Sequence, residues 1–217
     1  MMLRFAEEIM LLLLDDQDGS FQPIPEWSMQ CALAGAVLMD LALENRIDTD
    51  LESLVLVDKT PTGDPLLDAT LDRIATSKDV HSSRYWVENT AAYAEEIREA
   101  ALVRLVDNGI LTRQEDRFLW VFRSRRYPTV DGRAQREVKL RIMGVLLSDE
   151  IPDPRDIVII CLCDACSIFN DLLSARELEY ARARIDQVRK LDLIGQAVAK
   201  AVWEIQASLA MTAHPIY

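Results

Sequence analysis

The chain has 217 residues, of which 50% are hydrophobic and 28% are charged, a composition that suits one domain with a well-buried core. The formal net charge is −12 at pH 7, which argues against a protein that binds polyanions over its whole surface. Four cysteines, three of them within one apolar segment, are too few and too clustered for a secreted disulfide framework, so we expect a reducing, cytoplasmic environment.

The first two predicted helices differ in their expected burial. Residues 4–14 have apolar side chains at helical spacing and predict an amphipathic helix, in which Glu7 and Glu8 argue against a secretory leader. After a proline-containing loop that ends at the expected cap Ser28, Met29 to Leu43 contains few polar side chains and predicts a helix buried on nearly all sides. About 20 apolar residues are needed to cross a bilayer, so we expect this shorter helix to form the centre of a bundle.

Two short strands and a capped helix are expected next. Residues 47–49 and 54–57 have the apolar character of strands. The following PTGDPLLD segment contains aspartates and a glycine, as phosphate- and metal-binding loops do, but it lacks the lysine of a phosphate-binding loop. We favour a structural role, in which Gly63 permits a turn, Asp64 caps a helix and Pro65 occupies the first helical position.

The middle of the chain resembles part of a winged helix. Residues 77–90 are polar and are predicted to be irregular, and residues 91–106 predict a helix that stops at an Asn-Gly pair. Residues 110–112 and 118–122 predict a β-hairpin around the charged turn RQEDR, so a nucleic-acid-binding regulator is one alternative for the function. The acidic total charge and three glutamates on the candidate recognition helix oppose that alternative.

Basic residues gather in one part of the sequence. Residues 113–141 contain nine basic and four acidic residues, a local net charge of +5, whereas the rest of the chain carries −17. Arg123, Arg125 and Arg126 fall in a predicted exposed loop, and arginine can hold phosphate oxygens through two parallel hydrogen bonds. This polarity favours a partner that bears phosphate groups, and docking on an acidic protein without lipid affinity is the other alternative.

The remaining sequence predicts helices and contains no catalytic motif. Four segments have helical spacing: residues 136–147, 155–173, 175–190 and 193–211. Three thiols in the apolar second segment cannot complete a zinc site, so we expect buried cysteines. No motif surrounds His81 or His214, the two histidines, and the Glu7 and Glu8 pair is expected on a solvated helix face. We therefore expect a protein that is not an enzyme and holds no cofactor or metal.

Five sequence features extend over nearly the whole chain: EEIMLLLLDD, a small-residue helix ending in MDLALENRI, PTGDPLLDATLDRI, LVDNGILTRQEDRFLWVF and a set of apolar C-terminal helices. Together they resemble the Golgi phosphoprotein 3 family, and the short form is more similar to its bacterial branch. The resemblance implies a mostly α fold, with one globular domain over residues 1–217. Within that domain, a central apolar helical bundle is ringed by amphipathic helices and accompanied by short β-hairpins.

The resemblance also implies a membrane-binding site. Eukaryotic members bind phosphatidylinositol 4-phosphate through a tryptophan and arginines around a shallow pocket, beside a hydrophobic hairpin, and they act as adaptors for membrane enzymes. The tryptophan corresponds to Trp27 if the preceding loop shifts by two positions. Of the three arginines only Arg98 is present, because Ala34 and Glu95 occupy the other two positions, so the preferred lipid is left open.

The sequence therefore predicts a cytoplasmic, peripheral membrane protein that binds anionic phospholipid headgroups such as phosphoinositides, with membrane proteins as clients. The expected headgroup-binding residues are Trp27, Arg98, Arg123, Arg125 and Arg126. The expected membrane or self-association hairpin comprises Phe118, Leu119, Trp120 and Phe122. Each basic side chain near an anionic surface contributes about 1 kcal/mol, so binding is expected to be salt-sensitive.

Overall fold

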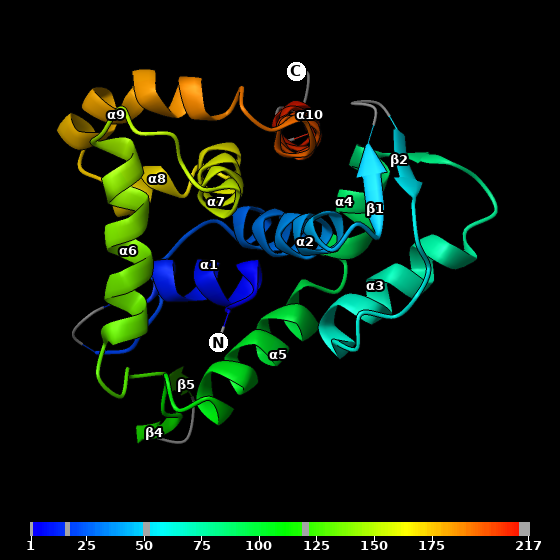
Figure 1. Cartoon of the computed structure of the whole chain (residues 1–217). Coiled ribbons are helices and arrows are strands. Elements are labelled where there is room, and N and C mark those ends of the chain that lie inside the picture. Colours follow the sequence, from blue (N-terminus) through cyan, green and yellow to red (C-terminus); the bar gives the residue numbers. More distant parts are fainter. Residues whose placement is uncertain (1, 16–17, 50–52, 119–121, 213–217) are drawn as a thin grey trace.

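Helix α2 (Glu26–Leu43) lies at the centre of the computed structural model, which describes residues 2–15, 18–49, 53–118 and 122–212 (Figure 1). Every residue from Cys31 to Ala42 is buried, as the apolar sequence predicts. A Cβ atom at Gly35 would lie 2.4 Å from Leu162, so the missing side chain lets a neighbouring helix approach closely. The predicted start at Ser28 is wrong, because the helix begins earlier at Glu26 and the Ser28 side chain is buried within it.

The other helices surround this centre. Their bounds are α1 (Phe5–Leu13), α3 (Pro65–Thr76), α4 (Ser83–Ala91), α5 (Ala94–Asp107), α6 (Arg133–Leu146), α7 (Pro154–Ala165), α8 (Phe169–Leu172), α9 (Ala175–Val188) and α10 (Leu193–Thr212). Helices α1, α3, α4, α5, α7 and α10 contact α2, whereas α6 packs on α1 and α7, and α9 packs on α6 and α7 (Figure 1). The predicted mostly α, single-domain fold is confirmed.

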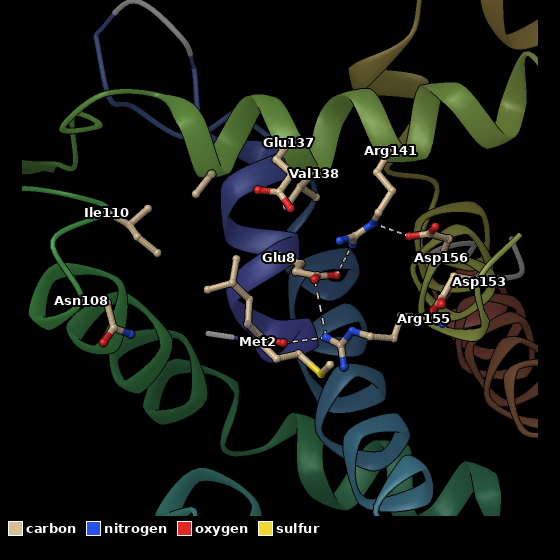
Figure 2. Close-up of a pocket in the computed structure, with 12 residues that line it drawn as sticks. Met2, Glu8, Asn108, Ile110, Glu137, Val138, Arg141, Asp153, Arg155 and Asp156 are labelled. Atoms are coloured by element: carbon tan, nitrogen blue, oxygen red, sulfur yellow. Dashed lines mark hydrogen bonds and ion pairs between the residues drawn. The ribbon is translucent and has the colours of Figure 1, made fainter.

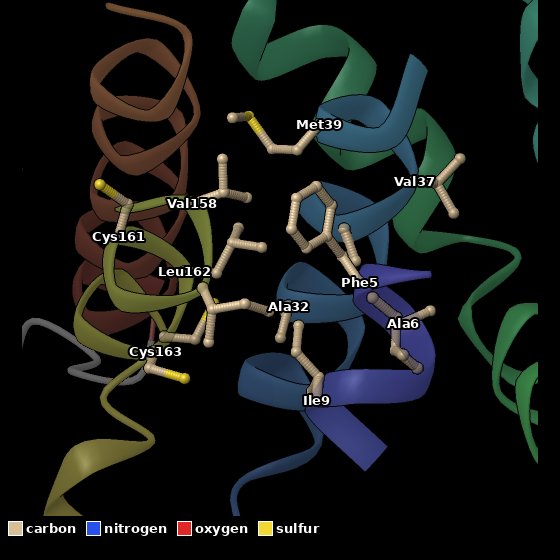
Figure 3. Packing of buried hydrophobic residues seen from close by; sticks show 14 of the residues in the cluster. Phe5, Ala6, Ile9, Ala32, Val37, Met39, Val158, Cys161, Leu162 and Cys163 are labelled. Carbon is tan, nitrogen blue, oxygen red and sulfur yellow. The ribbon is translucent and has the colours of Figure 1, made fainter. Parts of the chain in front are cut away.

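The core joins α1, α2 and α7. Figure 3 shows Phe5 and Ile9 of α1 beside α2, with Leu162 of α7 packing from the other side. All four cysteines are buried and free of disulfides, and burial raises the pKa of the Cys161 thiol to about 12. The prediction that the cysteines serve as buried hydrophobic side chains is therefore confirmed.

Two segments differ from their predicted structure. Residues 77–90, which were expected to be irregular, contain strand β3 (His81–Ser82) and most of α4. The Ser82 side chain caps α4 by accepting a hydrogen bond from the Tyr85 N–H. The helix buries only a narrow face, so its mostly polar sequence gave no sign of a packed helix. The single helix predicted over residues 155–173 is divided into α7 and α8 at Ser167, whose φ of 60° interrupts the helical backbone.

The three-stranded sheet follows the sequence closely. Strands β1 (Ile47–Thr49) and β2 (Ser53–Leu56) pair antiparallel, with Ile47 opposite Leu56, and β3 adds on the other side of β2. The two strands predicted in this region are therefore confirmed.

The second hairpin is displaced from its predicted position. Strands β4 (Gln114–Phe118) and β5 (Phe122–Arg126) pair from Gln114 and Arg126 to Phe118 and Phe122. Most of the predicted RQEDR turn is thus strand, and the three arginines predicted in a loop lie in β5. Apolar runs could not locate this ribbon, because its register is set by backbone hydrogen bonds between the two strands, and charged residues take part in it.

Candidate functional site

Phe21 joins segments that are distant in the sequence. Its ring centroid lies 5.9 Å from that of Tyr127, which follows β5, and 5.2 Å from the guanidinium carbon of Arg98 on α5. The Tyr127 N–H donates to the Gly19 carbonyl at 2.8 Å. Gly19 has a φ of +69°, and a Cβ atom there would lie 2.4 Å from the backbone nitrogen of Pro128, so this close approach requires glycine. The loop before α2 therefore connects the basic hairpin with Arg98.

A cavity of about 420 Å³ opens beside Phe21 and Arg98. It lies between residues 21–24, the first turns of α2 and the junction of α4 with α5. The Arg98 side chain is 33% exposed, and its buried Nε has no hydrogen-bond partner among the described residues. Arg98 lines the cavity, so the exposed third of its side chain is available to an acceptor on a ligand.

Two carboxylates reduce the positive charge of this cavity. Glu95 places a carboxylate oxygen 3.7 Å from an Arg98 guanidinium nitrogen, and Glu26 also lines the cavity. The Glu95 side chain is 78% exposed, so the ion pair is screened and weak. Ala34, the other replaced position, is completely buried within α2. The cavity is thus less basic than the three-arginine pocket that the sequence resemblance implies.

Trp27 lies on the first turn of α2 and packs partly buried against the core. Its neighbours Glu26 and Met29 line the cavity, but Trp27 is not among the lining residues. A role for Trp27 in headgroup binding stays a prediction.

The arginines of β5 adjoin the same loop. A guanidinium nitrogen of Arg126 lies 3.7 Å from a carboxylate oxygen of Asp18, just before Gly19. The backbone of Arg123 pairs with that of Arg117, and Arg125 pairs with Glu115. Backbone pairing thus places all three arginines on the strand that leads to Tyr127, and Phe21 connects this strand to Arg98.

The apolar end of the hairpin is described only in part. Phe118 and Phe122 are backbone partners at the ends of β4 and β5. Leu119 and Trp120 lie outside the described residues. The assignment of these four residues to a membrane or self-association hairpin stays a prediction.

The PTGDPLLD segment has the structural role that we favoured. Asp64 caps α3 by accepting a hydrogen bond from the Leu66 N–H at 3.1 Å, and Pro65 occupies the first position. The Asp68 carboxylate accepts hydrogen bonds from the Thr62 N–H and hydroxyl, both at 2.7 Å. These contacts account for the aspartates without a ligand. Within the described residues, no group of three histidine, cysteine or acidic side chains is placed to hold a metal ion.

A larger cavity of about 630 Å³ lies between α1, α6 and the start of α7 (Figure 2). Its wall includes Glu8, whose carboxylate lies 2.9 Å from Arg141 and 3.5 Å from Arg155. The expectation that Glu7 and Glu8 lie on a solvated face is wrong, since these residues are 0% and 2% exposed. The sequence around these two glutamates gave no indication that arginines from helices distant in the sequence would pair with them.

Comparison with known proteins decides the family. The family described as Golgi phosphoprotein 3 (GPP34) matches residues 5–205. This chain belongs to the Golgi phosphoprotein 3 family. Two similar relatives are both called vacuolar protein sorting-associated protein 74. The one from Eremothecium gossypii is 26% identical over 211 residues, and the one from Schizosaccharomyces pombe is 28% identical over 225 residues.

The aligned regions cover 82% and 86% of this chain, but 63% and 66% of the two relatives, so the chain spans less than two thirds of either. The Golgi phosphoprotein 3 match includes Phe21, Arg98 and the hairpin, and therefore the whole candidate site. Among the described helices of this family member, none has the length and apolar character needed to span a bilayer.

Proposed function

We propose that this protein attaches to membranes by binding the phosphorylated headgroup of an anionic phospholipid, of the phosphoinositide class, in the cavity beside Arg98. The partly exposed side chain of Arg98 in the lining of this cavity is the observation that carries the proposal. A phosphate oxygen would accept a hydrogen bond from the exposed part of this guanidinium group and place its negative charge against it. The names of the family and its relatives, which refer to the Golgi and to vacuolar sorting, support a membrane-associated role.

The hairpin supplies the second part of the proposed attachment. Arg123, Arg125 and Arg126 add positive charge on the strand that leads through Tyr127 to the Phe21 wall of the cavity. Because each basic side chain near an anionic surface contributes about 1 kcal/mol, the hairpin strengthens attachment without having to distinguish headgroups. In this proposal the hairpin end contacts the bilayer or a second subunit, and the protein is a non-enzymatic adaptor for membrane proteins.

Vesicle sedimentation at low salt tests the headgroup site. The wild-type protein is expected to bind phosphatidylcholine vesicles that contain phosphatidylinositol 4-phosphate and not vesicles of phosphatidylcholine alone. Arg98→Ala is expected to weaken binding about fivefold, the effect of roughly 1 kcal/mol. Arg176→Ala, which removes an exposed arginine from α9 on another part of the molecule, is the matched control. Equal binding to both vesicles, or equal binding by the two variants, would contradict the proposal.

A further inference from the structure

Helix α1 is surrounded at its N-terminal end by a buried ionic network. Among the described residues, the network contains six carboxylates, those of Glu7, Glu8, Asp40, Glu44, Asp64 and Asp156. Four guanidinium groups connect them, those of Arg4, Arg104, Arg141 and Arg155. All of these carboxylates except Glu44 belong to buried residues. A network with more carboxylates than guanidinium groups is difficult to keep fully ionised away from water.

Asp40 is the carboxylate whose negative charge is least compensated by nearby arginines. Its residue is 1% exposed, and one carboxylate oxygen accepts a hydrogen bond from the Phe5 N–H at 2.9 Å, where α1 begins. The other oxygen lies 3.9 Å from Arg4 and 3.8 Å from Arg155. Arg4 lies closer to Glu44, at 2.5 Å, and Arg155 lies closer to Glu8, at 3.5 Å. Each of these arginines is thus closer to another carboxylate than to Asp40.

Charged groups from every side of this cluster confirm the shortage of positive charge. Asp64 at the start of α3 accepts hydrogen bonds from Arg4 and from Arg104 of α5. Arg141 of α6 is held between Glu8 and Asp156 of α7 (Figure 2). The cations around Asp40 are therefore already engaged by other carboxylates, and a proton on Asp40 would relieve the imbalance.

The other end of α1 reaches the wall of the Arg98 cavity. The Leu13 carbonyl accepts a hydrogen bond from the Gln22 N–H at 2.8 Å, and Leu14 forms an antiparallel bridge with Phe21. Phe21 in turn contacts Arg98. One nine-residue helix, about 14 Å long, thus connects Asp40 with the headgroup cavity.

We propose that α1 is a pH-sensitive element: it is held firmly while Asp40 is protonated, and loss of that proton loosens α1 together with the Phe21 wall of the cavity. The loosening of α1 is independent of any ligand, and only its effect on lipid binding rests on the proposed function.

The burial of Asp40 determines whether stability rises or falls with pH. Desolvation raises the pKa of Asp40 to about 7, against the opposing effects of the Phe5 N–H, Arg4 and Arg155, and the charge of Glu8 raises it further. Burial also raises the pKa of Glu7, Glu8 and Asp156. The folded protein therefore holds a proton that the unfolded chain releases, and stability falls as the pH rises toward and through 7.

Hydrogen exchange of the lipid-free, full-length protein tests this proposal. After correction for intrinsic exchange rates, amides of residues 5–14 are expected to lose about tenfold in protection between pH 6 and pH 8. Asp40→Asn removes the ionisable group but keeps an oxygen that can accept from Phe5, and it is expected to abolish most of this change. Asp72→Asn, an equivalent change at an exposed position of α3, should behave as the wild type.

Two results would overturn the proposal: wild-type protection that is the same at both pH values, or an Asp40→Asn variant that retains the wild-type change. If Asp40→Asn does not fold, Glu8→Gln provides the second variant. Removing the Glu8 charge lowers the pKa of Asp40, so the loss of protection should move to lower pH, and an unmoved transition would count against the proposal.

Vesicle binding at pH 6 and pH 8 separates the two proposals. Relative to Asp40→Asn on the same vesicles, the wild type is expected to lose more affinity at pH 8. Equal losses would overturn the link between α1 and the cavity and leave the exchange result standing. Failure of Arg98→Ala to weaken binding at pH 6 would instead overturn the proposed function alone.

Discussion

Arg104 donates a hydrogen bond to Asp64 at 2.6 Å and thereby connects α5 to the residue that caps α3. Asp64 also accepts from Arg4 at 2.8 Å, so this one carboxylate links two helices and the N-terminal segment. The same group is therefore a helix cap and a counter-ion for two arginines.

Asp64→Ala should consequently destabilise the protein by about 3 kcal/mol, since it removes a cap and leaves two partly buried guanidinium groups without their shared partner. Urea unfolding at pH 7 measures the change, with Asp72→Ala on the same helix as the control. Its hydrogen-bond partners hold the pKa of Asp64 below its usual value, so its contribution is present at neutral pH and is lost as the pH falls through that lowered pKa. A loss no larger than that of the control would show that the cap and ion pairs contribute little.

Glycine is required at position 19 for two reasons, its positive φ and its contact with the backbone at Pro128. Gly19→Ala should therefore destabilise the protein by about 2–4 kcal/mol. Gly63 has a φ of +81° but open space around it, so Gly63→Ala isolates the conformational cost and should lose only about 1 kcal/mol. Thermal unfolding of both variants makes the comparison, and equal losses would show that the loop can move away from Pro128.

Glu95→Arg should strengthen binding to vesicles that contain phosphatidylinositol 4-phosphate. The change replaces a carboxylate at the cavity wall with a guanidinium, a difference worth about 2 kcal/mol, or roughly 30-fold in affinity. The side chain is 78% exposed, so little structural cost is expected. Glu96→Arg introduces the same charge at the next position of α5, which is exposed and does not line the cavity. Equal gains for both variants would indicate attraction to the surface without a defined headgroup site.

Replacing Arg123, Arg125 and Arg126 together with alanine should reduce vesicle binding by about two orders of magnitude at low salt, because three contributions of roughly 1 kcal/mol are lost. The effect should shrink as the salt concentration rises, since exposed charges are screened within about 10 Å at 0.1 M salt. Sedimentation across a salt series measures both changes. A loss that is independent of salt would point to misfolding of the hairpin rather than to electrostatic attraction.

Apolar patterning and helix-capping rules predicted the elements whose structure depends on their own residues. The burial of α2 follows from its apolar sequence, and the start of α3 follows from Asp64 and Pro65. The ionic network could not be predicted in this way, because Glu8 meets Arg141, 133 positions away, only after α6 packs on α1. The same limit applies to the cavity: the resemblance identified Arg98, but the role of Phe21 depends on a contact with Tyr127 that no local pattern shows.

The position of Phe21 between Tyr127 and Arg98 has a geometric consequence. A protein held at a single point on a bilayer can rotate about that point, whereas the proposed attachment through both the Arg98 cavity and the hairpin, joined by Phe21, would allow only a narrow range of tilts. In that attachment, the face of the domain farthest from the lipid would keep a constant height and orientation above the bilayer.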